Sequence, residues 1–126
     1  MSDDLVTLSM IVKDEEKTLA RTLASARPFI DRWVILDTGS TDGTREVIRE
    51  TLAGVRGELH EEPFADFSTT RNRALDLAGT DTEFVMWLDA DDELTDGAAL
   101  RAFLEQERGA GDPSREAYFQ IGRAHV

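Results

Sequence analysis

Runs of apolar residues alternate along the chain with segments in which apolar residues recur every three or four positions. The first run, "LVTLSMIV" at 5–12, is rich in β-branched residues and predicts a buried strand. Similar runs predict strands at 32–37 and 82–89, and "GELHEE" predicts a short one at 57–62. After the turn at 111–114, "EAYFQ" has the composition of the start of another strand.

Helical spacing fills the segments between these strands. Residues 14–26 have acidic residues at their start and apolar residues at Leu19, Leu23 and Ala26, so they predict a helix with an acidic first turn. Further helices are expected at three places, which are listed here with their caps: from Thr44, with Asp42 or Thr44 as N-cap; through "TTRNRALDLA", with Ser68 as cap; and through "DGAALRAFLEQER", with Thr95 as cap and Gly109 as the end.

Strand and helix therefore alternate four times. This order predicts an α/β fold with a mostly parallel sheet flanked by helices on both faces. Ligands of such sheets bind beyond the carboxyl ends of the strands. Three of the predicted strand ends are acidic: Lys13–Glu16, Asp37–Ser40 and Asp89–Asp92. We expect these acidic groups to converge on one ligand crevice.

The overall charge limits the partners. The chain has 126 residues, with 26 acidic and 14 basic side chains and a net charge of −12. Nucleic acids and anionic membranes usually bind to basic surfaces, so neither is expected as a partner, although a bound cation could bridge an anionic ligand to the protein. Cysteine is absent from the sequence, and no segment has the length of a membrane span or the basic start of a signal peptide. We therefore predict a cytoplasmic protein, with an attachment to the inner face of the membrane left open.

Two short motifs allow more than one interpretation. Asp37-Thr38-Gly39-Ser40 has the order found at an aspartic-protease carboxylate, but such a protease needs two carboxylates that share a proton, and this chain has one such loop, followed by a predicted helix. An aspartyl hydrolase therefore stays open only as a third hypothesis. Asp89 and Asp91 point the same way along an extended backbone and could address one divalent cation, or they could form a solvated strand end.

The combination of motifs is more specific than either motif alone. "LSMIVKDEE", "VILDTGSTDGT" and "TTRNRALDLAGTDTEFVMWLDADDEL" resemble, in order and spacing, the nucleotide-binding half of family 2 glycosyltransferases. The resemblance covers roughly residues 6–104, and among family members it is greatest to bacterial enzymes that modify lipopolysaccharide or other cell-surface glycans. It implies the GT-A fold and transfer of a sugar, typically with inversion, from a nucleotide-sugar donor such as a UDP-sugar to a glycan or lipid-linked acceptor.

The resemblance also implies a nucleoside site. The backbone around Val12 and the side chain of Glu15 would lie against the base and ribose. Asp37 would accept a hydrogen bond from the base, and Arg71 would lie beside the nucleotide and diphosphate. Trp87, like the other tryptophan of the chain, is expected to be a core or sheet-face residue.

The end of the fourth predicted strand would complete the donor site. The resemblance implies that Asp89 and Ala90 contact the ribose and that Asp91 ligates a Mn²⁺ or Mg²⁺ ion bridging the diphosphate. The family's catalytic base lies after the segment present here, so no residue of 1–120 is assigned to that role. The hypothesis from another class is a nucleotide-binding module without catalysis.

The C-terminal segment carries a separate hypothesis. Residues 121–126, "IGRAHV", are what a common sequencing adapter encodes in one reading frame. We expect residues 1–120 to be the N-terminal part of a GT-A domain, truncated after about four βα units and inactive by itself, and residues 121–126 to be a sequencing artefact.

Overall fold

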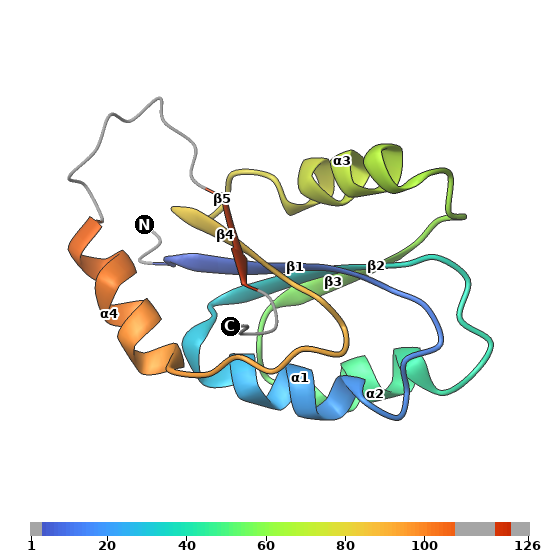
Figure 1. The fold of residues 1–126 in the computed structure, drawn as a ribbon, viewed down its shortest axis with the longest axis horizontal. Helices are drawn as coiled ribbons and strands as arrows, with labels where there is room; N and C mark the ends of the chain where they lie inside the picture. The colour runs from blue at the N-terminus through green and yellow to red at the C-terminus, as the bar shows by residue number, and fades with distance from the viewer. Residues whose placement is uncertain (1–3, 108–117, 122–126) are drawn as a thin grey trace.

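A parallel sheet forms the centre of the protein (Figure 1). The computed structural model describes residues 4–107 and the backbone of residues 118–121. Five strands lie in this part of the chain, in the order β3-β2-β1-β4-β5, and every neighbouring pair is parallel. Their bounds are β1 (Val6–Val12), β2 (Arg32–Asp37), β3 (Gly57–Glu61), β4 (Phe84–Leu88) and β5 (Tyr118–Ile121). The predicted α/β fold with a parallel sheet is confirmed.

Helices cover both faces of this sheet. Figure 1 shows α3 (Phe67–Ala78) on one face and α1 (Leu19–Ala26) with α2 (Thr44–Thr51) on the opposite face. A short 3₁₀ turn, η1 (Arg27–Phe29), follows α1, and α4 (Gly97–Glu107) contacts this turn. Right-handed crossovers between parallel strands produce this sandwich of helices around a sheet, because each connecting helix buries its apolar side against the strands.

Alternating side chains of the central strand β1 supply two cores. Leu8, Met10 and Val12 belong to the larger core beneath α1 and α2. Ile11 belongs to the smaller core on the α3 face, where it packs with Leu36, and Ala74 and Trp87 complete this second cluster. Neighbouring residues of a strand point to opposite faces, so a strand covered on both sides has to be apolar throughout. The apolar runs in the sequence reflect this burial.

Details of three predicted helix starts were wrong. Helix α2 begins at Thr44 as expected, but its N-cap is Gly43 rather than Asp42 or Thr44. Helix α1 begins at Leu19 rather than Asp14, and its first turn holds no acidic residue. Asp14 instead has a φ of 53°, which a continuing right-handed helix cannot contain. Helix α3 is capped by Asp66 rather than Ser68, since the Asp66 carboxylate accepts a hydrogen bond from the Thr69 amide. The expected end of the last helix at Gly109 lies outside the described residues.

The acidic segment before α1 is bonded to the loop after β2. The Asp14 amide donates to the Ser40 hydroxyl at 2.8 Å, and the Asp14 carboxylate accepts from the Thr41 amide at 2.7 Å. In the same way, the Glu15 amide donates to the Thr44 hydroxyl at 2.8 Å. The Glu16 carboxylate accepts a hydrogen bond from the Gly43 amide, in the loop after β2, at 3.0 Å. We call these two segments, 13–18 and 38–43, the paired loops. Together with the start of α2, they give hydrogen-bond partners to backbone amides that would have bonded within the helix if α1 were longer.

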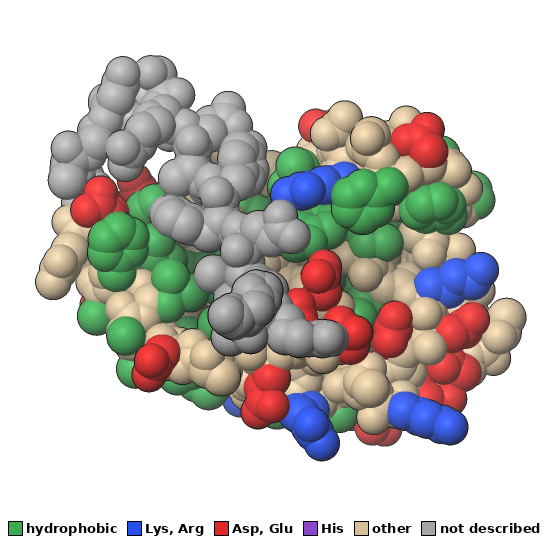
Figure 2. Space-filling model, in the orientation of Figure 1, with side chains coloured by type: hydrophobic (Ala, Val, Ile, Leu, Met, Phe, Trp, Pro, Cys, Tyr) green, Lys and Arg blue, Asp and Glu red, His purple; other side chains and the backbone are tan. Residues whose placement is uncertain are grey.

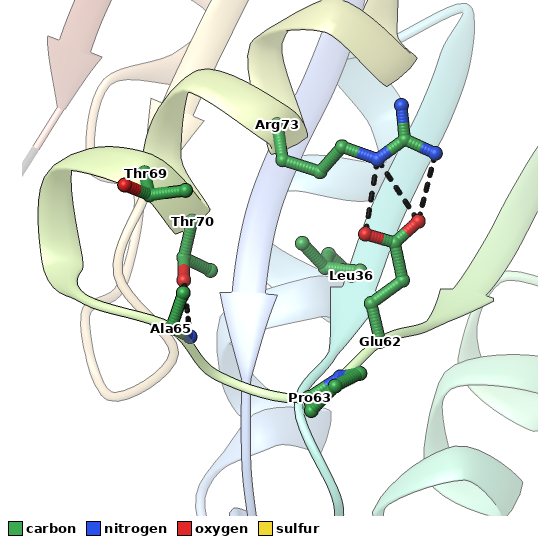
Figure 3. Close-up of a pocket in the computed structure, with 7 residues that line it drawn as sticks. All are labelled: Leu36, Glu62, Pro63, Ala65, Thr69, Thr70 and Arg73. Carbon is green, nitrogen blue, oxygen red and sulfur yellow. Dashed lines mark hydrogen bonds and ion pairs between the residues drawn. The ribbon is translucent and has the colours of Figure 1, made fainter.

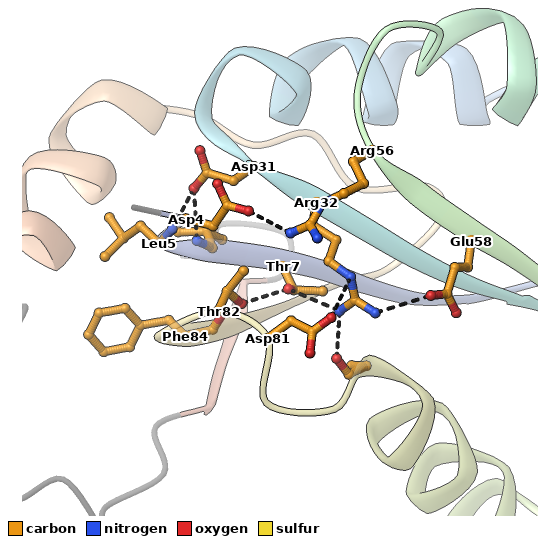
Figure 4. A network of polar contacts seen from close by, with 12 residues as sticks. Asp4, Leu5, Thr7, Asp31, Arg32, Arg56, Glu58, Asp81, Thr82 and Phe84 are labelled. Atoms are coloured by element: carbon orange, nitrogen blue, oxygen red, sulfur yellow. Dashed lines mark hydrogen bonds and ion pairs between the residues drawn. The ribbon is translucent and has the colours of Figure 1, made fainter. Parts of the chain in front are cut away.

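A buried arginine holds the opposite end of the sheet together (Figure 4). The side chain of Arg32 is 6% exposed, and its guanidinium donates to the Ala78 carbonyl at the end of α3, at 2.6 Å. It also lies 3.4 Å from Glu58 and 3.6 Å from Asp81. Thr7 joins the same group from β1. One cation therefore connects β1, β2, β3 and the C-terminal end of α3.

The proposed boundary near the C-terminus falls within β5. Ile121 is the last residue of this strand, and its backbone is paired with Leu88 of β4. Residues 122–126 lie outside the described residues. The strand expected from "EAYFQ" is confirmed, and the assignment of residues 121–126 to a sequencing artefact stays a prediction.

Candidate functional site

Six of the seven predicted site residues follow or end β2, β1 and β4, which are neighbours in the sheet, and the seventh, Arg71, lies on α3. Val12 and Asp37 are paired across β1 and β2, and β4 flanks β1 on its other side. Strands of a sheet are about 4.8 Å apart, so the ends of β2 and β4 are separated by roughly 10 Å. That spacing leaves room for one ligand to contact all three strand ends.

Asp37 ends β2 and is fully buried. Its Oδ1 atom accepts hydrogen bonds from the amides of Gly39 and Ser40, both at 2.8 Å, and lies 3.5 Å from the Arg45 guanidinium. Its Oδ2 atom is closed to solvent and has no hydrogen-bond partner in the described part of the chain. A buried carboxylate oxygen without a partner is costly, so it suggests an acceptor reserved for a donor group outside the chain.

Val12 lies beside Asp37, and Glu15 follows β1 in the first of the paired loops. The Val12 carbonyl accepts a hydrogen bond from the Thr38 amide at 3.0 Å, which extends the pairing of β1 and β2 by one residue. Glu15 is partly buried, and its amide is held by Thr44 as described above. The structure therefore pairs Val12 with Asp37 and fixes the Glu15 backbone at the start of α2, while the Glu15 carboxylate accepts a hydrogen bond from the Thr18 hydroxyl at 3.4 Å.

Asp89–Asp92 form a turn after β4. The Asp92 amide donates to the Asp89 carbonyl at 3.1 Å, and the side chains of Asp89 and Asp91 are exposed, whereas that of Asp92 is buried. Ala90 is also buried, and its carbonyl accepts a hydrogen bond from the Thr22 hydroxyl at 2.9 Å. Helix α1 thus fixes the backbone of the turn that carries the two exposed carboxylates.

A second contact from α1 supports the same segment. Ser25 accepts a hydrogen bond from the Leu94 amide at 2.8 Å and donates to the Thr22 carbonyl at 2.7 Å. Sequence reasoning missed both hydroxyl residues, because they lie on a helix about 70 positions from the turn they hold. Their spacing of three on α1 was the only available signal.

Arg71 and Asp89 meet at the side chain of Trp87. The Arg71 guanidinium carbon lies 5.0 Å from the centroid of the indole ring, within the range of a cation–π interaction. The indole Nε1 donates to Asp89 Oδ1 at 3.3 Å. Trp87 is buried in the small core, so the prediction of a core or sheet-face position is confirmed. Its contacts with two predicted ligand-binding residues were not anticipated.

The carboxylates of the Asp89–Asp92 turn could hold a divalent cation only together with further oxygen atoms from a bound ligand. Within residues 4–107, no group of three or more His, Cys, Asp or Glu side chains is arranged to hold a metal ion. Asp89 and Asp91 nevertheless supply carboxylate oxygens, which Mg²⁺ and Mn²⁺ prefer. Mg²⁺ in particular is commonly held by one or two carboxylates together with substrate phosphates and water. The donor set is therefore suited to a metal that arrives with a diphosphate.

A pocket of about 170 Å³ lies beside the predicted site, between α3 and the loop after β3 (Figure 3). Its lining is Leu36, Glu62, Pro63, Ala65, Thr69, Thr70 and Arg73. Figure 3 shows the side chains of Arg73 and Glu62 joined to each other at the pocket, and their ion pair measures 2.8 Å. The hydrogen bond from Arg73 holds the pKa of the Glu62 carboxyl below its usual value. None of the predicted site residues lines this pocket, although Leu36 precedes Asp37 in β2.

The surface around these elements is mixed. Figure 2 shows acidic side chains gathered between α3 and the layer formed by α1 and α2, with hydrophobic side chains next to α3. Phe64 and Phe67, which flank the cap of α3, are 53% and 59% exposed. The predicted acidic rim is therefore bordered by aromatic surface on the α3 side.

The fold and the acidic strand ends define an α/β domain of the kind that binds nucleotides at the carboxyl edge of its sheet. The family model described as "Glycosyl transferase family 2" matches residues 7–119. The chain belongs to this family.

Two relatives with curated descriptions are similar to this chain, and one of them is described as a glycosyltransferase. A TPR repeat-containing protein of Synechococcus elongatus is 42% identical over 103 residues, which is 80% of this chain and 24% of that protein. The SPbeta prophage-derived glycosyltransferase SunS of Bacillus subtilis is 31% identical over 87 residues, which is 68% of this chain and 20% of SunS. The chain thus spans about a quarter or less of these relatives.

Solved structures show the same fold. Residues 1–349 of S. aureus TarS superpose with a TM-score of 0.67 at 20% identity, over 82% of this chain and 33% of that one. TarS has also been solved in complex with UDP. Glucosyl-3-phosphoglycerate synthase of Mycobacterium tuberculosis, in complex with Mg²⁺ and UDP, superposes with a TM-score of 0.59 at 21% identity, over 87% of this chain and 41% of that one. The GT-A fold expected from the sequence is confirmed.

In the described residues, no helix combines the length and the apolar character that crossing a bilayer requires.

Proposed function

We propose that this chain binds the nucleotide-sugar donor, a UDP-sugar, of a glycosyltransferase. The observation that carries the proposal is the Oδ2 atom of Asp37, which is buried at the end of β2 without a partner in residues 4–107. A uracil N–H group is a donor of the required kind. Because Oδ2 is closed to solvent in the free chain, the atoms that cover it have to move when the base binds, and we infer that the Gly39–Ser40 segment, whose amides hold Oδ1, is the part that moves. Gly39 has a φ of 120° and is exposed.

The other predicted residues complete the donor site in this proposal. Val12 and Glu15 lie against the base and ribose, Arg71 faces the diphosphate, and Asp89 and Ala90 contact the ribose. Asp91 ligates Mn²⁺ or Mg²⁺ together with the diphosphate. Such a cation, when bound, neutralises the charge that develops on the leaving diphosphate. Glucosyl-3-phosphoglycerate synthase, which shares the fold, has been solved with UDP and either ion.

The reaction in this proposal is an inverting transfer to a cell-surface glycan or a lipopolysaccharide-type acceptor. An acceptor hydroxyl attacks the anomeric carbon from the face opposite the diphosphate, the bond to the diphosphate breaks, and the hydroxyl proton passes to a general base. No residue of 1–120 is assigned as that base. The cytoplasmic location predicted from the sequence also stays a prediction.

Calorimetric titration with UDP and GDP, each with and without Mn²⁺, tests the donor site. We expect UDP to bind more tightly in the presence of Mn²⁺. Asp37→Asn removes a charged acceptor, and a hydrogen bond to a charged group contributes about 1.5–3 kcal/mol, so UDP binding should weaken roughly 10- to 150-fold. Glu61→Gln is the matched control, because Glu61 is exposed and lies on the other side of Arg45.

Two results would contradict the donor site. One is an absence of UDP binding in the presence of Mn²⁺, and the other is equal affinity for UDP in the Asp37→Asn variant and the parent. The alternative is a nucleotide-binding module without catalysis. In a sugar-transfer assay on the chain, with an acceptor supplied, we expect binding without turnover, and measurable turnover would exclude the module without catalysis.

A further inference from the structure

We propose that Trp87 is a positioning residue, which holds Arg71 and Asp89 in the arrangement that binds the nucleotide. The inference rests on the proposed function, because it takes these two residues as ligand-binding groups. It adds a third residue whose own contact is with the protein rather than with the ligand.

The indole ring of Trp87 contacts both residues through different parts of its surface. Its face carries the Arg71 guanidinium, 5.0 Å from the centroid, and its Nε1 atom donates to Asp89 Oδ1 at 3.3 Å. The ring face of tryptophan attracts cations, while the indole N–H can only donate a hydrogen bond. A cation on the ring face and a carboxylate at the N–H are the two partners that this ring binds best.

Burial makes this contact a constraint on both partners. Trp87 is 5% exposed and packs with Leu36 and Ala74 beneath α3. Side chains in such a core stay in one rotamer, so the direction of the N–H group is set by packing. Trp87 and Asp89 are two residues apart at the end of β4 and thus share a face, which places the carboxylate within reach of the ring.

The other tryptophan provides a matched control. Trp33 is also buried, at 8% exposure, and its Nε1 atom donates to the Val55 carbonyl at 2.9 Å. It belongs to the larger core, on the opposite face of the sheet from Trp87. Its hydrogen bond therefore stabilises the fold without involving any predicted site residue.

The test measures UDP affinity in the presence of Mn²⁺ for Trp87→Phe, Asp89→Ala, the double variant and Trp33→Phe. Trp87→Phe keeps an aromatic face for Arg71 and removes the N–H group. We expect it to raise the Kd for UDP about 3- to 10-fold, the range that corresponds to the net contribution of one hydrogen bond. Trp33→Phe should leave the Kd within twofold of the parent. In the Asp89→Ala background, Trp87→Phe should cause no further loss of affinity, because the carboxylate through which it acts is gone.

Fluorescence supplies a readout in the free protein. In the Trp33→Phe variant the emission comes from Trp87, and we expect Asp89→Ala to shift its maximum. An unchanged spectrum would overturn the contact on which the inference depends.

Binding separates the remaining outcomes. If the parent binds UDP and Trp87→Phe binds it equally well, or if Trp87→Phe weakens binding by the same factor with and without Asp89, then the role of Trp87 is refuted and the donor site stands. If the parent chain binds no UDP, the proposed function fails, and the role of Trp87 fails with it.

Discussion

The buried guanidinium of Arg32 allows a stability prediction whose size follows from the structure. Arg32→Met keeps most of the aliphatic part of the side chain and removes the charge. The main loss is the hydrogen bond to the Ala78 carbonyl, because this carbonyl is buried at the end of α3. A buried acceptor left without its partner costs about 1–3 kcal/mol.

The other contacts of Arg32 contribute less. Glu58 and Asp81 are 52% and 57% exposed, and exposed ion pairs are worth about 0–1 kcal/mol each. Removing the buried charge also removes its desolvation penalty, which offsets part of the loss. We therefore expect Arg32→Met to lower the free energy of unfolding by about 2 kcal/mol. For a domain of this size the corresponding fall in Tm is roughly 5–10 °C.

Urea unfolding followed by circular dichroism measures this change. The slope m should stay constant, so that the shift in midpoint reports stability alone. Glu58→Gln and Asp81→Asn are the controls, and each should cost less than about 1 kcal/mol. The reasoning is refuted if Arg32→Met stays within about 0.5 kcal/mol of the parent. A loss in Asp81→Asn as large as that in Arg32→Met would also refute it, because the ion pair would then outweigh the bond to α3.

Three further predictions concern other parts of the fold. Gly57→Ala should lower the free energy of unfolding by about 1–3 kcal/mol in urea titrations, because its Cβ would lie 2.2 Å from the buried Trp33 ring. Gly43→Ala, whose Cβ would meet only the end of a flexible side chain at 3.1 Å, should be much milder, and equal losses would contradict the steric argument. Burial raises the pKa of Asp31, but hydrogen bonds from Arg101 and two backbone amides outweigh it, and the net pKa is lowered. Asp31 therefore stabilises the fold above its unfolded pKa of about 3.9, and this contribution is lost as the pH falls through the folded value. We expect Asp31→Asn to lower the free energy of unfolding, relative to the parent, mainly at pH 7 and much less at pH 3. A loss of the same size at both pH values would show that the stabilisation does not come from the ionised carboxylate. Thr22→Val should cost about 1–3 kcal/mol in thermal or urea unfolding, since it removes the hydroxyl that contacts a buried carbonyl after β4, whereas Thr22→Ser should stay near the parent.

Strands β1, β2 and β4 could be predicted because burial on both faces leaves a clear signal in the sequence, whereas the order of the strands in the sheet was not predicted. Each of the three apolar runs became a strand within two residues of its expected ends, and so did the more polar segment predicted at 57–62. The start of α1 could not be predicted in the same way. Asp14 and Glu15 have the composition of a helical first turn, yet their amides bond to Ser40 and Thr44, which lie 26 and 29 positions further along. Local propensity does not contain such long-range competition.

The candidate site likewise contains some features that local sequence predicts and others that only long-range contacts determine. The acidic strand ends were predicted, because parallel strands carry their carboxyl ends to one edge. The residues that hold those ends in place were not predicted. Thr22 acts from α1 on a carbonyl 68 positions away, and the contact of Trp87 with Arg71 depends on how α3 crosses the sheet. Pairwise contacts of this kind become visible only once the helices are packed. The seven site residues named from the family resemblance remain to be tested by binding.

The paired loops also restrict how this domain can be altered. Asp14 and Glu16 in the first loop form hydrogen bonds with residues of the second loop, among them Ser40 and Gly43. Neither loop therefore has a complete set of hydrogen bonds without the other. A chimaera that took residues 13–18 from a relative and kept residues 38–43 would combine two mismatched halves. An exchange of these loops between relatives should therefore move both loops together. Natural substitutions in one loop should likewise be accompanied by substitutions in the other.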